Sequence, residues 1–279
     1  MTDEEHMHPL QEDATIEALS QKLYGSALPR IEGIAQVVSA VERQGALFVP
    51  KIEPGTPKSK VDLFVLSLAR ARADVVVLTG KILREEPELH YEPTLHDKSS
   101  ALVEALIDFR KSTLGFSTKP LLAVLTSGCS FPQDHVALRG RECRLFTSKA
   151  GVSSLDNIGC SVEILEEPSI TAVVSWLWSR GYRSILIEAG PSTAKDLYQD
   201  APVDPAVDTV DPAVDTKSAH QVRELLLSTL KSDMPIQMAG KLLDSDRLHR
   251  AFRATSAGLA WNEPNGAWLF RRMIHRDIL

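Results

Sequence analysis

The chain has 279 residues, with 31 Lys and Arg against 37 Asp and Glu, and therefore a formal net charge of −6. Hydrophobic residues make up 43% and charged residues 24%, a composition typical of a globular protein with a sizeable core. The mild negative charge and the lack of a sustained run of Lys and Arg argue against nucleic acid or a membrane surface as a partner. No apolar stretch approaches the roughly 20 residues that span a bilayer.

The N-terminal sequence and the cysteines favour a location inside the cell. Residues 1–8 are polar and acidic, unlike a secretory or transit peptide. Cys129, Cys143 and Cys160 form no C-x-x-C pair, and an odd, sparse set suits a reducing compartment. We therefore expect a cytoplasmic protein in which the cysteines stay reduced.

The first predicted element is a short amphipathic helix over residues 13–24, within an N-terminal arm of residues 1–30. A strand over residues 31–39 follows and leads into a turn-like segment at 42–45. The S-x-x-D capping pattern at Ser59 then begins an amphipathic helix.

Helices followed by buried strands recur after that point. The β-branched run at 73–80 is bounded by a helix and a glycine, which is typical of a buried strand in a parallel sheet. The further helices and strands that we predict cover residues 101–109, 121–128, 144–147, 162–165, 169–181 and 184–190. This alternation predicts a three-layer α/β sandwich with a central, mostly parallel sheet.

Residues 199–220 break the pattern, because V-D-P-A-V-D-T occurs twice in succession. Proline and like charges support neither a helix nor a central strand, so we interpret this segment as a disordered surface insertion. Strands over 222–229, 251–261 and 269–274 follow, and Asn265-Gly266 is the predicted turn of a closing antiparallel hairpin.

Ligands in open α/β sheets bind at the carboxyl ends of the strands, and three of the predicted strands end in small or flexible residues. These residues are Thr79, Gly80, Thr126, Ser127, Gly128, Glu188, Ala189, Gly190, Pro191 and Ser192. The turn at 190–192 precedes a short helix, where backbone N–H groups and the helix dipole favour a phosphate. A plain strand-to-helix turn accounts for the same spacing.

The sequence lacks the motifs of several common classes of enzyme. The sequence contains no G-x-G-x-x-G, P-loop, H-E-x-x-H or G-x-S-x-G motif, and its histidines form no readable triad. Nucleotide binding with chemistry on a bound cofactor is what remains. Lys81 and Arg84 follow a strand end, where they either meet an anionic substrate or remain solvated surface charges.

Four segments carry a family resemblance: residues 68–89, 120–128, 182–197 and 266–276. The first is similar to L-R-A-x-A-D-A followed by D-x-P-x-L, and the third is similar to a strand that ends in E-G-G-P. Together they resemble the C-terminal reductase domain of the bifunctional riboflavin-biosynthesis deaminase-reductases. The resemblance implies a dihydrofolate-reductase-like α/β domain over residues 31–279, in a stand-alone chain because no deaminase zinc motif precedes it.

That family reduces the ribosyl group of a pyrimidine ribosylamine 5′-phosphate to ribityl with hydride from NADPH. The resemblance implies that the ten strand-end residues named above bind NADPH, and that Lys81, Arg84 and Glu86 contact a small phosphorylated substrate. No metal is implied. A homodimer is one expectation for its assembly, because this fold commonly dimerises in the family.

Two alternatives stay open. A catalytically silent dinucleotide-binding or interaction protein is favoured by the missing Asp-Gly pair after the first strand and by the missing Arg after Leu89. A reductase acting on a pterin or folate-like ring rests on fold analogy alone.

Overall fold

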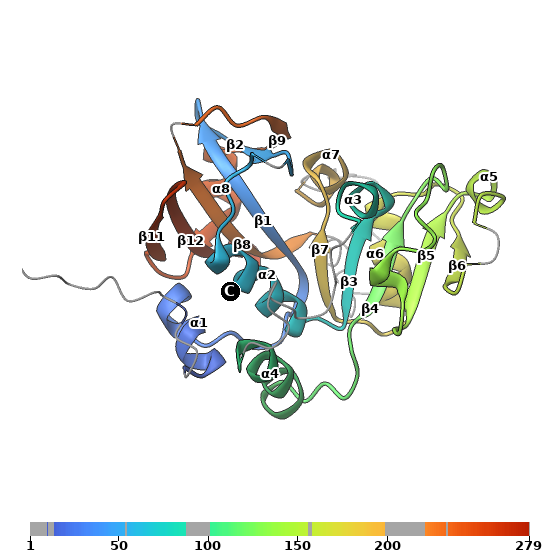
Figure 1. The fold of residues 1–279 in the computed structure, drawn as a ribbon, viewed down its shortest axis with the longest axis horizontal. Helices are drawn as coiled ribbons and strands as arrows, with labels where there is room; N and C mark the ends of the chain where they lie inside the picture. Colours follow the sequence, from blue (N-terminus) through green and yellow to red (C-terminus); the bar gives the residue numbers. More distant parts are fainter. Residues whose placement is uncertain are drawn as a thin grey trace, which may run out of the picture.

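The computed structural model describes residue 10 and residues 14–53, 55–87, 101–155, 158–198, 221–232 and 234–278. In these residues one mixed sheet carries helices on both of its faces (Figure 1). The strands are β1 (Gly33–Arg43), β2 (Ala46–Pro50), β3 (Val75–Thr79), β4 (Leu121–Leu125), β5 (Cys143–Thr147), β6 (Ser161–Ile164), β7 (Ser184–Glu188), β8 (Val222–Lys231), β9 (Met238–Asp244), β10 (Phe252–Ala254), β11 (Leu259–Glu263) and β12 (Gly266–His275).

The α-helices are α1 (Ile16–Tyr24), α2 (Lys60–Ala71), α3 (Gly80–Glu85), α4 (Ala101–Asp108), α5 (Lys149–Val152), α6 (Ile170–Ser179), α7 (Pro191–Ala194) and α8 (Ser245–Ala251). The helix that was predicted over 101–109 extends further in the structure, because α4 continues as a π-helical segment, η1 (Phe109–Thr113). Short 3₁₀ helices are η2 (Val136–Leu138), η3 (Lys195–Tyr198) and η5 (Arg276–Ile278).

The sheet is parallel in its centre and antiparallel at its C-terminal side. Its strand order is β10-β12-β8-β1-β7-β3-β4-β5-β6, and every neighbouring pair from β8 to β6 is parallel. Strand β12 runs antiparallel to β8, and β10 and β11 both pair with β12. The predicted α/β sandwich, with a mostly parallel sheet closed by an antiparallel hairpin, is confirmed.

Strand β3 shows how one short apolar run supplies two hydrophobic cores. Val75 and Val77 belong to the cluster that packs under α6, and Val76 and Leu78 belong to the cluster under α1, α2 and α4. Successive side chains of a strand point to opposite faces, so a buried strand of a three-layer fold must be apolar throughout.

Several sequence-based boundaries are wrong. The hairpin turn lies one residue earlier than predicted: Glu263 pairs with Gly266, so Pro264 and Asn265 form the loop and Gly266 begins β12. The strand predicted over 251–261 is instead the end of α8 followed by the separate strands β10 and β11. Strands β2 and β9 were not predicted; β2 pairs with the far end of β1, and β9 pairs with β2.

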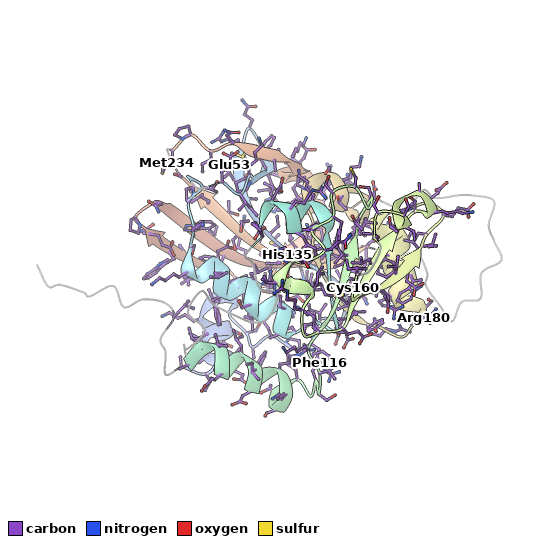
Figure 2. The ribbon with its side chains drawn as sticks, turned by 45° about the vertical axis from the view of Figure 1, so that its right-hand side comes forward. Glu53, Phe116, His135, Cys160, Arg180 and Met234 are labelled. Atoms are coloured by element: carbon purple, nitrogen blue, oxygen red, sulfur yellow. A yellow bond between two sulfur atoms is a disulfide. The ribbon has the colours of Figure 1, made fainter. Side chains whose placement is uncertain are left out.

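The cysteines also depart from expectation. Cys143, at the start of β5, forms a disulfide with Cys160 just before β6, with 5.1 Å between their Cα atoms (Cys160 is labelled in Figure 2). Cys129 is free and exposed. The spacing of 17 residues gives no local signal for this pair, because the partners meet only when β5 and β6 align. The expectation of three reduced cysteines is therefore wrong for two of them.

 

The segment at 199–220, predicted to be a disordered insertion, lies outside the described residues, and so do residues 1–9 of the predicted arm. The helix of that arm is confirmed as α1, which packs Ile16, Leu19 and Leu23 into the core beside α4 and β12. Within the described ranges, no helix combines the length and hydropathy needed to cross a bilayer.

A buried charge network joins α2 to the antiparallel side of the sheet. Arg72, at the end of α2, donates from one nitrogen to both carboxylate oxygens of Glu224 on β8, at 3.0 and 2.8 Å. Arg272 on β12 donates to the same carboxylate at 2.7 Å. Burial alone would raise the pKa of Glu224, but the two guanidinium groups outweigh it and hold the pKa below its ordinary value.

We expect Arg72→Met to lower the free energy of unfolding at pH 7 by about 3 kcal/mol, because it leaves a buried carboxylate with one partner instead of two. The pKa of Glu224 is depressed in the folded protein, so this contribution is lost as the pH falls. The difference from wild type should therefore shrink in acid. Urea unfolding between pH 4 and 7 measures it. Arg253→Met, at an exposed position on β10, is the control, and equal stabilities of the two variants would contradict the assignment.

Candidate functional site

The predicted site residues gather at one edge of the sheet, where the parallel strands end. Thr79 pairs in register with Leu125, and Leu78 pairs with Glu188, so the ends of β3, β4 and β7 are adjacent. Figure 1 shows α3, α5 and α7 along this edge, each directly after the strand that precedes it. The fold thus brings together three groups of residues that are far apart in the sequence.

The end of β3 lies tightly against the end of β4. Thr79 caps α3 with its side chain, and Gly80 is the first residue of that helix. A Cβ atom on Gly80 would lie 2.8 Å from Oγ1 of Thr126 and 3.3 Å from the ring of Phe131. Only glycine permits this approach, so Gly80 shapes the edge through packing.

The loop after β4 is held by a second close contact. Oγ1 of Thr126 accepts a hydrogen bond from the N–H of Gly128 at 3.1 Å. Gly128 has a φ of +81°, and a Cβ there would lie 2.3 Å from the carbonyl oxygen of Gly151 in α5. Ser127, between them, is exposed. The loop therefore presents Ser127 outward on a rigid backbone.

A polar atom without a partner lies beneath this loop. Thr147, the last residue of β5, is fully buried, and its Oγ1 has no hydrogen-bond partner among the described residues. A Cβ on Gly151 would lie 2.1 Å from that oxygen. Because this oxygen is fully buried against the backbone of α5, it helps to pack the edge and is not open to a ligand.

The turn after β7, unlike the tightly packed ends of β3 and β4, has free space beside its glycine. Gly190 is the N-cap of α7 and Pro191 its first residue, so the helix begins within the turn predicted at 190–192. A Cβ atom on Gly190 would meet nothing within 4 Å. The carbonyl of Ala189 accepts from the side chain of Gln36 at 3.3 Å, and Ser192 is exposed. Space beside Gly190 is thus available to a ligand.

The side chain of Glu188, just before this turn, is held by an ion pair with Arg70. Nε and Nη2 of Arg70, on α2, each donate to one of its carboxylate oxygens at 2.7 Å. The side chains are 1% and 9% exposed, so this is a buried, two-pronged ion pair. Glu188 therefore contributes a fixed negative charge beside the turn.

Glu86 is the predicted site residue whose pKa is shifted. Burial, reinforced by the charge of Glu188, raises the pKa of Glu86 from 4.5 to about 7, although Arg70 opposes the shift. Its backbone is fixed by His135, labelled in Figure 2. Nδ1 of His135 accepts from the N–H of Ala137 at 3.0 Å, so Nε2 carries the proton and donates to the carbonyl of Glu86 at 2.9 Å.

The two predicted cations lie on the outer side of α3. Lys81 is 65% exposed and forms an ion pair with Glu85 at 3.6 Å. Arg84 is exposed and donates to the carbonyl of Cys129, in the loop after β4, at 3.3 Å. Both cations thus flank the edge, and their contact with a substrate stays a prediction.

Sequence reasoning missed Arg70, His135, Gly151 and Thr147. Arg70 had the clearest signal, since it lies in the last turn of an amphipathic helix that precedes a buried strand, where a buried arginine needs a partner. The identity of that partner, 118 residues away, is a tertiary fact.

The raised pKa of Glu86 predicts how stability depends on pH. The folded protein binds this proton more tightly than the unfolded chain, so the free energy of unfolding should fall as the pH rises from about 4.5 to 7. We expect the fall in the free energy of unfolding over this pH range to be about 2 kcal/mol smaller in Glu86→Gln than in wild type. Urea unfolding at a series of pH values measures it, with Glu104→Gln, at an exposed position of α4, as control. Parallel pH curves for wild type and Glu86→Gln would contradict the assignment.

Comparisons with known proteins agree on the fold. No family model matches the sequence, and no curated protein matches it. A pyrimidine reductase-like protein from Corynebacterium diphtheriae superposes with a TM-score of 0.57 and 18% identity, over 94% of this chain and 99% of that one.

RibD from Acinetobacter baumannii, in two crystal forms, superposes with a TM-score of 0.54 in both, at 13% and 12% identity. The matches cover 92% and 93% of this chain but 59% and 61% of RibD, so the chain spans about three fifths of that protein. The resemblance found in the sequence is therefore confirmed for the fold: this chain has the dihydrofolate-reductase-like fold that these reductase structures share.

Proposed function

We propose that this protein is an NADPH-dependent reductase that converts the ribosyl group of a pyrimidine ribosylamine 5′-phosphate to ribityl. The observation that carries the proposal is the edge at which β3, β4 and β7 end together beside an open turn at Gly190, with Glu86 following the helix after β3. Burial raises the pKa of Glu86 to about 7. Similarity in fold to a pyrimidine reductase-like protein and to RibD supports the substrate class.

The residues at the edge suit a dinucleotide. A Cβ atom on Gly190 would meet no other atom within 4 Å, so the space beside this turn can admit part of a ligand. The residues that would hold NADPH are those of the three strand ends: Thr79, Gly80, Thr126, Ser127, Gly128, Glu188, Ala189, Gly190, Pro191 and Ser192. NADPH, when bound, supplies the hydride.

The protein's own part is to bind the phosphate and deliver a proton. Reduction of a C=O or C=N bond adds a hydride to carbon and a proton to oxygen or nitrogen. Glu86 holds a proton near neutral pH because its pKa is about 7, a value suited to a general acid. Lys81 and Arg84 would bind the substrate phosphate through charge-assisted contacts.

Gly190→Val tests the cofactor site. We expect it to weaken NADPH binding at least tenfold, measured by isothermal titration, because the added side chain occupies the space beside the turn. The thermal midpoint without NADPH should hardly change, since a Cβ there touches nothing. Gly159→Val, at an exposed glycine that is also free of contacts, is the matched control.

Unchanged affinity in Gly190→Val would place NADPH elsewhere. Failure of wild type to bind either NADPH or NADH would favour the alternative, an interaction protein that retains the fold without its chemistry.

Lys81→Ala and Arg84→Ala test the substrate site. We expect each to raise KM for a ribosylamino-pyrimidine phosphate at least tenfold, on the order of 1.4 kcal/mol for one lost charge-assisted contact. NADPH affinity should change much less. Lys22→Ala, at an exposed position on α1, controls for net charge. Unchanged KM in both variants would place the substrate phosphate elsewhere.

A further inference from the structure

A buried glutamine lies in the strand next to the open turn at Gly190. Gln36 belongs to β1, which runs parallel to β7, and it is fully buried. In the register of the two strands it lies opposite Ile187, shortly before the turn. A primary amide at this depth is costly unless its N–H and C=O groups find partners, so its partners decide what the residue does in the fold.

Both ends of the amide have a partner, and both partners belong to the segment that contains the turn. Nε2 of Gln36 donates to the carbonyl of Ala189 at 3.3 Å, and Oε1 accepts from the hydroxyl group of Tyr198. The amide must be oriented in this way, because a carbonyl group can only accept. Burial raises the pKa of Tyr198 above its ordinary value, so its hydroxyl group keeps the proton that it donates.

The segment between these two hydrogen bonds consists of the turn, α7 and η3. Ala189 lies just before Gly190, and Tyr198 is the last residue of η3. Figure 1 shows α7 beyond the end of β7. The far end of the segment is also anchored to α8, because Arg247 donates to the carbonyl of Tyr198. One side chain of an internal strand thus holds the segment at both of its ends.

The hydrogen bond to Ala189 also sets the direction of the next amide group. The carbonyl of Ala189 and the N–H of Gly190 belong to one planar trans peptide, in which the two groups point in opposite directions. Because Gln36 holds the carbonyl toward itself, the N–H of Gly190 is directed away from the buried amide. The peptide plane that borders the open space is therefore fixed from inside the sheet.

We propose that Gln36 is a positioning residue of the turn at Gly190, which acts by holding the peptide between Ala189 and Gly190 in one orientation. The inference rests on the proposed function, in which this turn binds NADPH. Gln36 touches neither cofactor nor substrate, because it is fully buried. Without its hydrogen bond this peptide could rotate, and binding of NADPH would have to include the cost of ordering it.

The peptide in question can be observed directly by NMR of the full chain without any ligand. When alanine carries ¹³C at its carbonyl and glycine carries ¹⁵N, each Ala–Gly peptide gives one signal. The sequence has four such pairs, at 150–151, 189–190, 239–240 and 257–258. Gly190→Val identifies the 189–190 signal by its loss, and the other three signals are internal controls.

Gln36→Met removes the amide and keeps nearly the same shape. We expect it to shift the 189–190 signal, because a carbonyl carbon responds to the loss of a hydrogen bond that its oxygen accepts, and to leave the other three signals in place. The dissociation constant of NADPH, measured by isothermal titration, should rise about tenfold or more. Ser20→Ala is the matched control: it removes a buried hydrogen bond to the carbonyl of Ile16 in α1, and it should change neither quantity.

Tyr198→Phe provides a second variant should Gln36→Met fail to fold, which circular dichroism shows. It keeps the bond to Ala189 but releases the other end of the amide, so the same signal should shift by less. An unmoved 189–190 signal in the variants that fold would overturn the proposal, and so would unchanged NADPH affinity in a variant whose signal moves. If wild type binds no NADPH, the proposed function fails, and the NMR signal alone decides whether Gln36 orients the turn.

Discussion

Two buried arginines in one turn at the end of α2 determine how this helix sits on the sheet. Arg70 binds Glu188 at the end of β7, and Arg72 binds Glu224 near the start of β8. Charges at such depth are stable only with partners, so each pair holds the helix to a particular strand. The binding edge depends on this constraint, because Glu188 directly precedes the open turn at Gly190.

Glycine has two roles at the same edge. Gly80 and Gly128 lie where a Cβ atom would collide with neighbouring atoms, so they let strand ends and loops approach closely. Gly190 lies where a Cβ atom would meet empty space. The first two build a rigid wall, and the third leaves room beside it. A packed wall with an adjacent opening would suit the extended cofactor that we propose, since little ordering would remain to be done on binding.

The acid chemistry of the site follows from its surroundings. Glu86 follows a short helix, its backbone is held by a histidine of fixed tautomer, and burial raises the pKa of its carboxyl group to about 7. The same residue on an open surface would be almost fully ionised at that pH. The environment supplied by β7, α2 and α3 thus gives this glutamate the pKa that the proposed proton donor needs.

Local patterns were enough to predict the elements whose signals are complete within a few residues: the cap at Ser59, the apolar run of β3 and the short helix after β7. They also predicted which strand ends meet, because parallel strands place their carboxyl ends at one edge. The partners of Arg70 and Cys143, and the pairing of β2 with β9, were decided only by the tertiary structure. Such contacts join segments that are far apart in the sequence and share no local pattern, so they form, and stabilise the protein, only when the chain folds.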